Sequence, residues 1–213
     1  MHLMHTKYIL NSGGIKREPK LQKLYHQEIV QGLGNAPKFL LCNFAQGREF
    51  WDTKFRGYCE SIKADMPAGV TPSFELAMPA TFAEQCKRAD VIYMHGGDDH
   101  LLRYWMRQFD LPELFKDKVV AGNSAGSDLL VAHHWSNDWR TCGDGLGIVP
   151  VKFIPHFGSV TDPADQRGQA DWQKGYEELA AYGDTSLPIY ALHEGEFAVF
   201  IDGKEQKRVL RGA

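Results

Sequence analysis

Short apolar segments rich in strand-forming residues alternate along the chain with longer segments in which apolar residues recur every three or four positions. The first kind predicts buried β-strands and the second predicts amphipathic helices. Their alternation is typical of a mostly parallel sheet covered by helices on both faces, so we expect an α/β three-layer sandwich. The predicted strands are 7–10, 38–44, 73–78, 89–95, 119–121, 151–154, 189–192, 197–201 and 208–210.

The predicted helices follow from their apolar stripes. One begins near Pro19, carries apolar residues at intervals of four and stops at Gly34. Further helices are predicted around 51–62, 101–109, 125–134 and 164–182. Asp202-Gly203 is a turn signal between the last two strands and predicts a small C-terminal β-hairpin. Since no repeat or low-complexity tract interrupts the chain, a single domain over 1–213 is expected.

Composition narrows the class of protein. Of 213 residues, 43% are hydrophobic and 24% are charged, and the net charge is −3, so no basic surplus favours nucleic acid as a partner. No apolar run reaches the roughly 18 residues of a membrane span, and the first residues lack the pattern of a signal peptide. A cytoplasmic protein without a membrane partner is therefore expected. The four cysteines have no metal-ligand spacing, so we expect them to be reduced and expect no metal or cofactor.

One motif indicates a catalytic site. The segment Gly122-Asn123-Ser124-Ala125-Gly126 matches G-x-S-x-G and lies between a predicted strand and a predicted helix, which is the context of a nucleophile elbow. Small residues are needed there because the turn is sharp. Ser124 would lie at the helix N-terminus, where backbone N–H groups face a developing negative charge. The alternative is a glycine-rich turn with a capping serine.

A serine nucleophile requires a base and an orienting acid. His156 and His193 each follow a predicted strand directly, and His156 is the better base because Pro155 stiffens its backbone. Glu194 ends another strand and is the favoured acid. Four aspartates remain alternatives to it: Asp128, Asp138, Asp144 and Asp162.

The order of these residues and the need for an oxyanion hole refine the prediction. Ser124, His156 and Glu194 run in the order serine, histidine, acid, which differs from the order in α/β-hydrolases. The backbone N–H groups of Ala125 and Gly97 are the predicted oxyanion donors, since Gly97 follows the neighbouring strand and carries no Cβ to block a carbonyl. The adjacent aspartates Asp98-Asp99 are too weak a pattern to indicate a metal site.

Together these residues resemble a family. The chain is similar over nearly its whole length to peptidase E (α-aspartyl dipeptidase) and cyanophycinase, serine peptidases with a class I glutamine amidotransferase-like (flavodoxin-like) fold. The motifs that carry the resemblance are Asn11-Ser12-Gly13-Gly14, His95-Gly96-Gly97-Asp98, Gly122-Asn123-Ser124-Ala125-Gly126, Asp144-Gly145-Leu146-Gly147, Ile154-Pro155-His156-Phe157 and His193-Glu194-Gly195. The resemblance implies that Ser124 is the nucleophile, His156 the base and Glu194 the third member of the triad.

Two positions depart from the family pattern and bear on the substrate. Asp98 and the residues after it replace a usual Asn-Thr, and Asn123 stands where Trp or Thr is common. We expect both residues to contact the substrate. Arg167 is the predicted cation for an acidic substrate side chain, whereas Asp98 and Asp99 would repel such a group.

The sequence therefore predicts a serine exopeptidase, foremost a dipeptidase acting on small peptides, with N-terminal Asp-Xaa peptides as candidates. A non-catalytic ligand-binding domain of the same fold is an alternative, because a fold does not fix a function. An esterase or amidase acting on a non-peptide would use the same triad. The oligomeric state is left open, a homodimer included.

Overall fold

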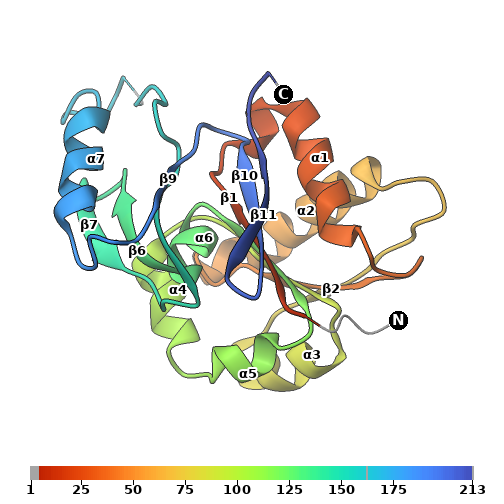
Figure 1. The fold of residues 1–213 in the computed structure, drawn as a ribbon. Coiled ribbons are helices and arrows are strands. Elements are labelled where there is room, and N and C mark those ends of the chain that lie inside the picture. The colour runs from red at the N-terminus through yellow and green to blue at the C-terminus, as the bar shows by residue number, and fades with distance from the viewer. Residues whose placement is uncertain (1–4, 162, 213) are drawn as a thin grey trace.

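The larger sheet is mostly parallel, as predicted. A computed structural model describes residues 5–161 and 163–212 of the chain (Figure 1). In this sheet β1, β5, β4, β2 and β3 run parallel, and β10 and β11 are antiparallel additions beside β1. Across the sheet the strands are β11 (Lys204–Val209), β10 (Phe197–Ile201), β1 (Lys7–Asn11), β5 (Val119–Asn123), β4 (Val91–Met94), β2 (Lys38–Cys42) and β3 (Ser73–Leu76).

Alternation along these strands divides the core into two layers. Ile9 and Tyr93 face the layer formed with α1 (Pro19–Val30) and α2 (Trp51–Asp65). Leu10 and Met94, their chain neighbours, face the other layer. Helices of that layer are α3 (Phe82–Arg88), α4 (Asp99–Met106), α5 (Leu111–Phe115) and α6 (Ala125–Leu130). Because successive strand residues point to opposite faces, buried strands need apolar residues at every position, and this explains their continuous apolar runs.

A second sheet was not predicted from the sequence. It has four strands, in the order β7 (Thr141–Asp144), β6 (Val131–Ser136), β8 (Val149–Ile154) and β9 (Ile189–Ala191). The helix α7 (Trp172–Ala181) packs on it, and Figure 1 shows these elements at the left of the main sheet. Val151 and Tyr190 of this sheet share a buried cluster with Leu10 of the main sheet.

Two predicted helices are wrong in part. The segment 125–134 is helical only to Leu130 and continues as β6, so His133 and His134 lie on a strand. The segment 164–182 is helical only from Trp172, because its earlier residues form turns and Asp171 caps the helix by accepting a hydrogen bond from the Lys174 N–H.

Smaller differences concern the ends of elements and the short helices. The helix α1 ends at Val30, before Gly34, and the last strand is Lys204–Val209 instead of 208–210. Asp202 and Gly203 both have positive φ and form the predicted hairpin turn. The residues that the structure describes include the 3-10 helices η1 (Ile15–Arg17), η2 (Arg48–Phe50) and η3 (Pro79–Thr81).

The carboxyl edge of the parallel strands gathers the loops that matter for function. In register, Leu10 of β1 and Met94 of β4 both pair with Gly122 of β5, so the residues after these strands emerge side by side. Ligands of open α/β sheets bind at this edge. Within the described part of the chain, none of the helices is both long and apolar enough to span a bilayer.

Candidate active site

Ser124 lies at the sharp turn between β5 and α6. Its backbone has φ 50° and ψ −114°, a conformation that residues with a side chain rarely adopt. A Cβ at Gly122 would lie 2.6 Å from the Ser127 nitrogen, and a Cβ at Gly126 would overlap the Met94 carbonyl oxygen. Both glycines of the motif are therefore required by close packing, and the turn presents Ser124 at the sheet edge.

His156 follows β8 and reaches the serine from the second sheet. Its Nε2 lies 3.0 Å from Ser124 Oγ, so the serine hydroxyl can donate to this nitrogen when the ring proton is on Nδ1. The backbone of His156 has φ 54°. Its N–H donates to the Ser12 hydroxyl over 2.7 Å and to the Ser12 carbonyl over 3.2 Å, and these bonds hold the strained backbone in place.

Glu194 lies behind the histidine, in the loop between β9 and β10. Its Oε1 faces His156 Nδ1 at 3.4 Å, and the same oxygen accepts a hydrogen bond from Arg17 Nη1 over 2.8 Å. Glu194 is 8% exposed. The hydrogen bond with His156 and then the contact with Arg17 lower the pKa of Glu194 to about 2, although burial acts in the opposite direction.

The loop 11–14 after β1 joins these segments. The Asn11 carbonyl accepts the Ser124 N–H over 3.0 Å, and the Asn11 amide donates to the Gly195 carbonyl over 3.1 Å. Gly13 has φ +98° and lies close to the His156 ring. A Cβ on Gly13 would overlap the Nε2 and Cε1 atoms of that ring. Gly14, at φ +61°, leaves room for Glu194 in the same way. One loop thus contacts the serine, the histidine and the glutamate segments.

His156 lines three hollows, and Ser124 lines two of them. The largest, the main cavity, measures about 430 Å³ and is lined by Ser124, His156, Glu194 and basic residues. A hollow of about 20 Å³ is also lined by Ser124, and a third of about 270 Å³ is lined by Ser159, Thr161, Asp165 and Arg167. The basic residues of the main cavity are Lys16, Arg17 and Lys54.

The predicted oxyanion donors lie beside the serine. Gly97 and Ser124 both line the main cavity and the small hollow. Ala125 is the first residue of α6, so its N–H has no acceptor within the helix. The neighbouring Gly96 passes close to the serine, because a Cβ there would lie 3.1 Å from Ser124 Cβ.

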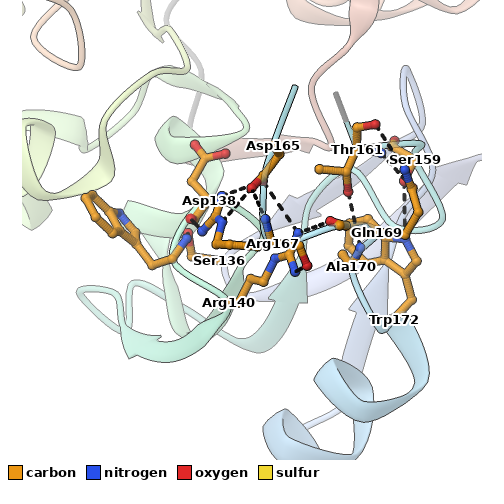
Figure 2. A network of polar contacts seen from close by, with 12 residues as sticks. Ser136, Asp138, Arg140, Ser159, Thr161, Asp165, Arg167, Gln169, Ala170 and Trp172 are labelled. Carbon is orange, nitrogen blue, oxygen red and sulfur yellow. Dashed lines mark hydrogen bonds and ion pairs between the residues drawn. The ribbon is translucent and has the colours of Figure 1, made fainter. Parts of the chain in front are cut away.

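The three residues predicted to bind substrate lie in different surroundings. Asn123 lines the main cavity. Asp98 instead caps α4, where its carboxylate accepts the Leu101 N–H over 2.9 Å, and it does not line the main cavity. Arg167 lines the third hollow, but its guanidinium is held by two hydrogen bonds to Asp165, of 2.9 and 2.7 Å, and also donates to the Asp138 carbonyl (Figure 2).

Among the described residues, none of the alternative acids makes a hydrogen bond with the His156 ring. Asp128 is buried in α6, and burial raises its pKa to about 7. Asp144 contacts His133 at 2.8 Å. Asp138 lines the main cavity, where it is Glu194 and not Asp138 that faces His156 Nδ1. Asp162 lies outside the described residues.

Two placements were not foreseen. His193, the alternative base, packs against Phe157 with ring centroids 5.7 Å apart. The histidine that faces Ser124 Oγ is His156. Arg17 was missed altogether, although it follows the first strand and its glycine loop, a position at the functional edge that could have indicated it. Among the described residues no group of three or more histidine, cysteine or acidic side chains is placed to hold a metal ion.

A strained serine beside a histidine, at the carboxyl edge of a mostly parallel sheet, places the protein among α/β proteins with a serine-centred site. Comparison with known proteins narrows this class. The model of Peptidase family S51 matches residues 9–209, so the chain belongs to that family.

Individual relatives agree with this assignment. The chain is 30% identical over 138 residues to Peptidase E of Pasteurella multocida, a match that spans 60% of this chain and only 57% of that protein. The fold is similar to that of a putative Peptidase E from Listeria monocytogenes, with a TM-score of 0.63, 16% identity and coverage of 96% and 99% of the two chains. It is also similar to a peptidase from an acI-B1 actinobacterium, with a TM-score of 0.60, 19% identity and coverage of 100% and 97%.

Proposed function

We propose that the protein is a serine exopeptidase that hydrolyses dipeptides through an acyl-enzyme. Ser124 Oγ attacks the scissile carbonyl while His156 Nε2 takes its proton, and Glu194 orients the imidazole. The C–N bond then breaks as His156 returns the proton to the leaving amine. Water then attacks the resulting ester while His156 takes its proton. This step releases the acid and restores the serine hydroxyl. The N–H groups of Gly97 and Ala125 stabilise the oxyanion.

The observation that supports this proposal most directly is the 3.0 Å separation of Ser124 Oγ and His156 Nε2 at a strained strand-to-helix turn. A serine hydroxyl is a weak nucleophile unless a base lies within hydrogen-bond reach. A ligand-binding domain would have no need for that contact or for a glutamate behind the histidine.

The main cavity supports a small, acidic substrate. Its volume of about 430 Å³ suits a small molecule, and three cations line it against the carboxylates of Asp138 and Glu194. The negative charge of Glu194 is already balanced by its ion pair with Arg17. An Asp-Xaa dipeptide carries two carboxylates and one ammonium group, which complements this balance. Asp98, which could have repelled such a substrate, is occupied as a helix cap.

A serine-directed phosphonate tests the nucleophile without knowledge of the substrate. Intact mass and peptide mapping should show one adduct, on Ser124, and none in the Ser124→Ala protein. Asp-Xaa dipeptides would then be compared with other dipeptides, and Ser124→Ala should lower turnover at least about a thousandfold. If folded protein forms no adduct with several probes, the ligand-binding alternative replaces the proposal. Turnover of esters but not of dipeptides would instead identify a non-peptide hydrolase.

A further inference from the structure

Arg17 and His156 share one oxygen of the proposed triad acid. Arg17 Nη1 donates to Glu194 Oε1 over 2.8 Å, whereas His156 Nδ1 lies 3.4 Å from that same oxygen. The arginine side chain is 73% exposed, and the glutamate side chain is 10% exposed. In the proposed reaction His156 becomes an imidazolium, which the carboxylate of Glu194 stabilises. A guanidinium on the same carboxylate oxygen weakens that stabilisation, because it brings a second positive charge close to the imidazolium.

Contacts other than the one with Arg17 also hold Glu194 in place. The Arg211 guanidinium donates two hydrogen bonds, each of 3.2 Å, to the Glu194 carbonyl. The backbone of Gly14 packs against the glutamate side chain, where a Cβ would overlap Cδ. Because these contacts restrain both the backbone and the side chain, Arg17 can leave the carboxylate without loss of its position.

Arg17 can reach a ligand from where it lies. It is the last residue of η1, directly after the loop 11–14, and it lines both the main cavity and the third hollow. Among the described residues, Glu194 is the one acid with which it forms an ion pair. An exposed arginine with one carboxylate partner can exchange that partner for the carboxylate of a ligand, since the guanidinium binds either in the same way.

Two further cations make the main cavity attractive to an anion. The ammonium groups of Lys16 and Lys54 form no ion pair with any described acid, and Lys16 Nζ lies 5.6 Å from the centre of the Tyr58 ring. Tyr58 stacks on the buried His95 with ring centroids 3.5 Å apart. Burial above all lowers the pKa of His95, and the charges of both lysines are among the lesser causes, so both lie near this ring pair. The cavity therefore has a local positive surplus that favours a carboxylate.

We propose that Arg17 binds the C-terminal carboxylate of a dipeptide in place of Glu194, and that this exchange frees the triad acid to act on His156. The inference rests on the proposed function. In a dipeptide the carboxylate carbon is two bonds from the nitrogen that leaves, so it must lie in the cavity lined by Ser124 and His156, which Arg17 also lines. A longer peptide or an amidated dipeptide has no anion at this place, and Arg17 then stays on Glu194. Arg17 is thus a specificity-determining residue that acts on the rate of reaction as well as on binding.

Asp-Ala and its C-terminal amide test the binding of the carboxylate. In the wild type, kcat/KM for Asp-Ala should exceed that for the amide by about 10 to 100 times, the effect of one charge-assisted hydrogen bond, and part of the difference should appear in kcat. In Arg17→Gln this preference should fall about tenfold. Arg17→Lys keeps the positive charge and should retain part of the preference.

A probe without a carboxylate tests the exchange itself. The diphenyl phosphonate analogue of alanine is used, and the second-order rate of Ser124 modification is measured by intact mass. Because Arg17→Gln leaves Glu194 to His156 alone, this rate should rise about three- to tenfold while turnover of Asp-Ala falls. An arginine that only held Glu194 in place would not give opposite changes in the two assays. Arg56→Gln removes an exposed arginine of α2 that does not line the main cavity, and it should leave both rates unchanged.

The outcomes distinguish the exchange from the proposed function. If Arg17→Gln does not raise the rate of phosphonate modification, Arg17 does not restrain the triad and the exchange is refuted. If the wild type does not favour Asp-Ala over its amide, or hydrolyses neither while the phosphonate still reacts, the carboxylate site is refuted although the nucleophile stands. If the phosphonate leaves Ser124 of the folded protein unmodified, the proposed function itself fails.

Discussion

Gly13→Ala should abolish the proposed hydrolysis without unfolding the protein. A Cβ at Gly13 would lie 2.4 Å from both Nε2 and Cε1 of His156, whereas ordinary van der Waals contact begins at 3.4 Å. The imidazole must therefore retreat by about 1.0 Å, the difference between these two distances. Added to the present 3.0 Å between Nε2 and Ser124 Oγ, this displacement takes the pair beyond hydrogen-bond distance.

The expected loss of kcat is about a hundredfold, the scale reported for a misplacement of 1 Å in a catalytic group. The substitution also places a side chain at φ +98°, which costs about 1–3 kcal/mol of stability. A typical domain tolerates that loss and remains folded. The rate of Ser124 modification by the phosphonate should fall in parallel with kcat, because both depend on His156 as the base.

Gly32→Ala is the matched control. Gly32 has φ +88°, and a Cβ there would meet no atom within 4 Å, so this variant has the backbone cost without the collision. Thermal denaturation should show the backbone cost in both variants and a further loss from the collision in Gly13→Ala, whereas only Gly13→Ala should lose activity. If folded Gly13→Ala kept its rate within threefold of the wild type, His156 would not act from the position described here.

Two further predictions concern stability. Lys152 is fully buried, and its ammonium group donates to the carbonyls of Leu179, Ala180 and Tyr182 at the end of α7, so Lys152→Met should cost about 3 kcal/mol in urea denaturation. Lys174→Met replaces an exposed lysine of the same helix and should change the unfolding free energy little. Equal effects of the two substitutions would refute a stabilising role for the Lys152 ammonium group at the end of α7. Because the pKa of Glu194 is lowered to about 2 in the folded state, its contribution to stability is complete above the ordinary pKa and is lost as pH falls from about 5 towards 2. The difference in unfolding free energy between wild type and Glu194→Gln should shrink over that range, and a constant difference would contradict the lowered pKa.

The parts of the fold that local pattern dictates could be predicted. The turn at Ser124 needs Gly122 and Gly126 for steric reasons that act within a few residues, so the motif and its strand-to-helix context were visible in the sequence. The buried strands were visible because both of their faces are covered and every position is apolar.

What could not be predicted depends on contacts between distant segments. The residues after Leu130 were assigned to a helix, because a short apolar run does not distinguish a helix from a strand that pairs with β8. Residues 164–171 were also assigned to a helix, although Gly168, at φ +72°, and the capping Asp171 are signals against it. Arg17 contacts Glu194 across 177 positions, and no local pattern encodes that pair.

The loop 11–14 has a consequence for the newly made protein. Ser124 directly follows β5, a strand in the middle of the main sheet, but Glu194 is placed only when the segment before β10 closes onto Asn11 and Gly13. Synthesis runs from the N-terminus, so a growing chain carries its serine long before its glutamate. The proposed triad is therefore incomplete early in synthesis, and a chain clipped before Glu194 would keep the proposed nucleophile without its acid. If the proposed function holds, hydrolytic activity appears only after the segment around Glu194 has closed onto the loop 11–14.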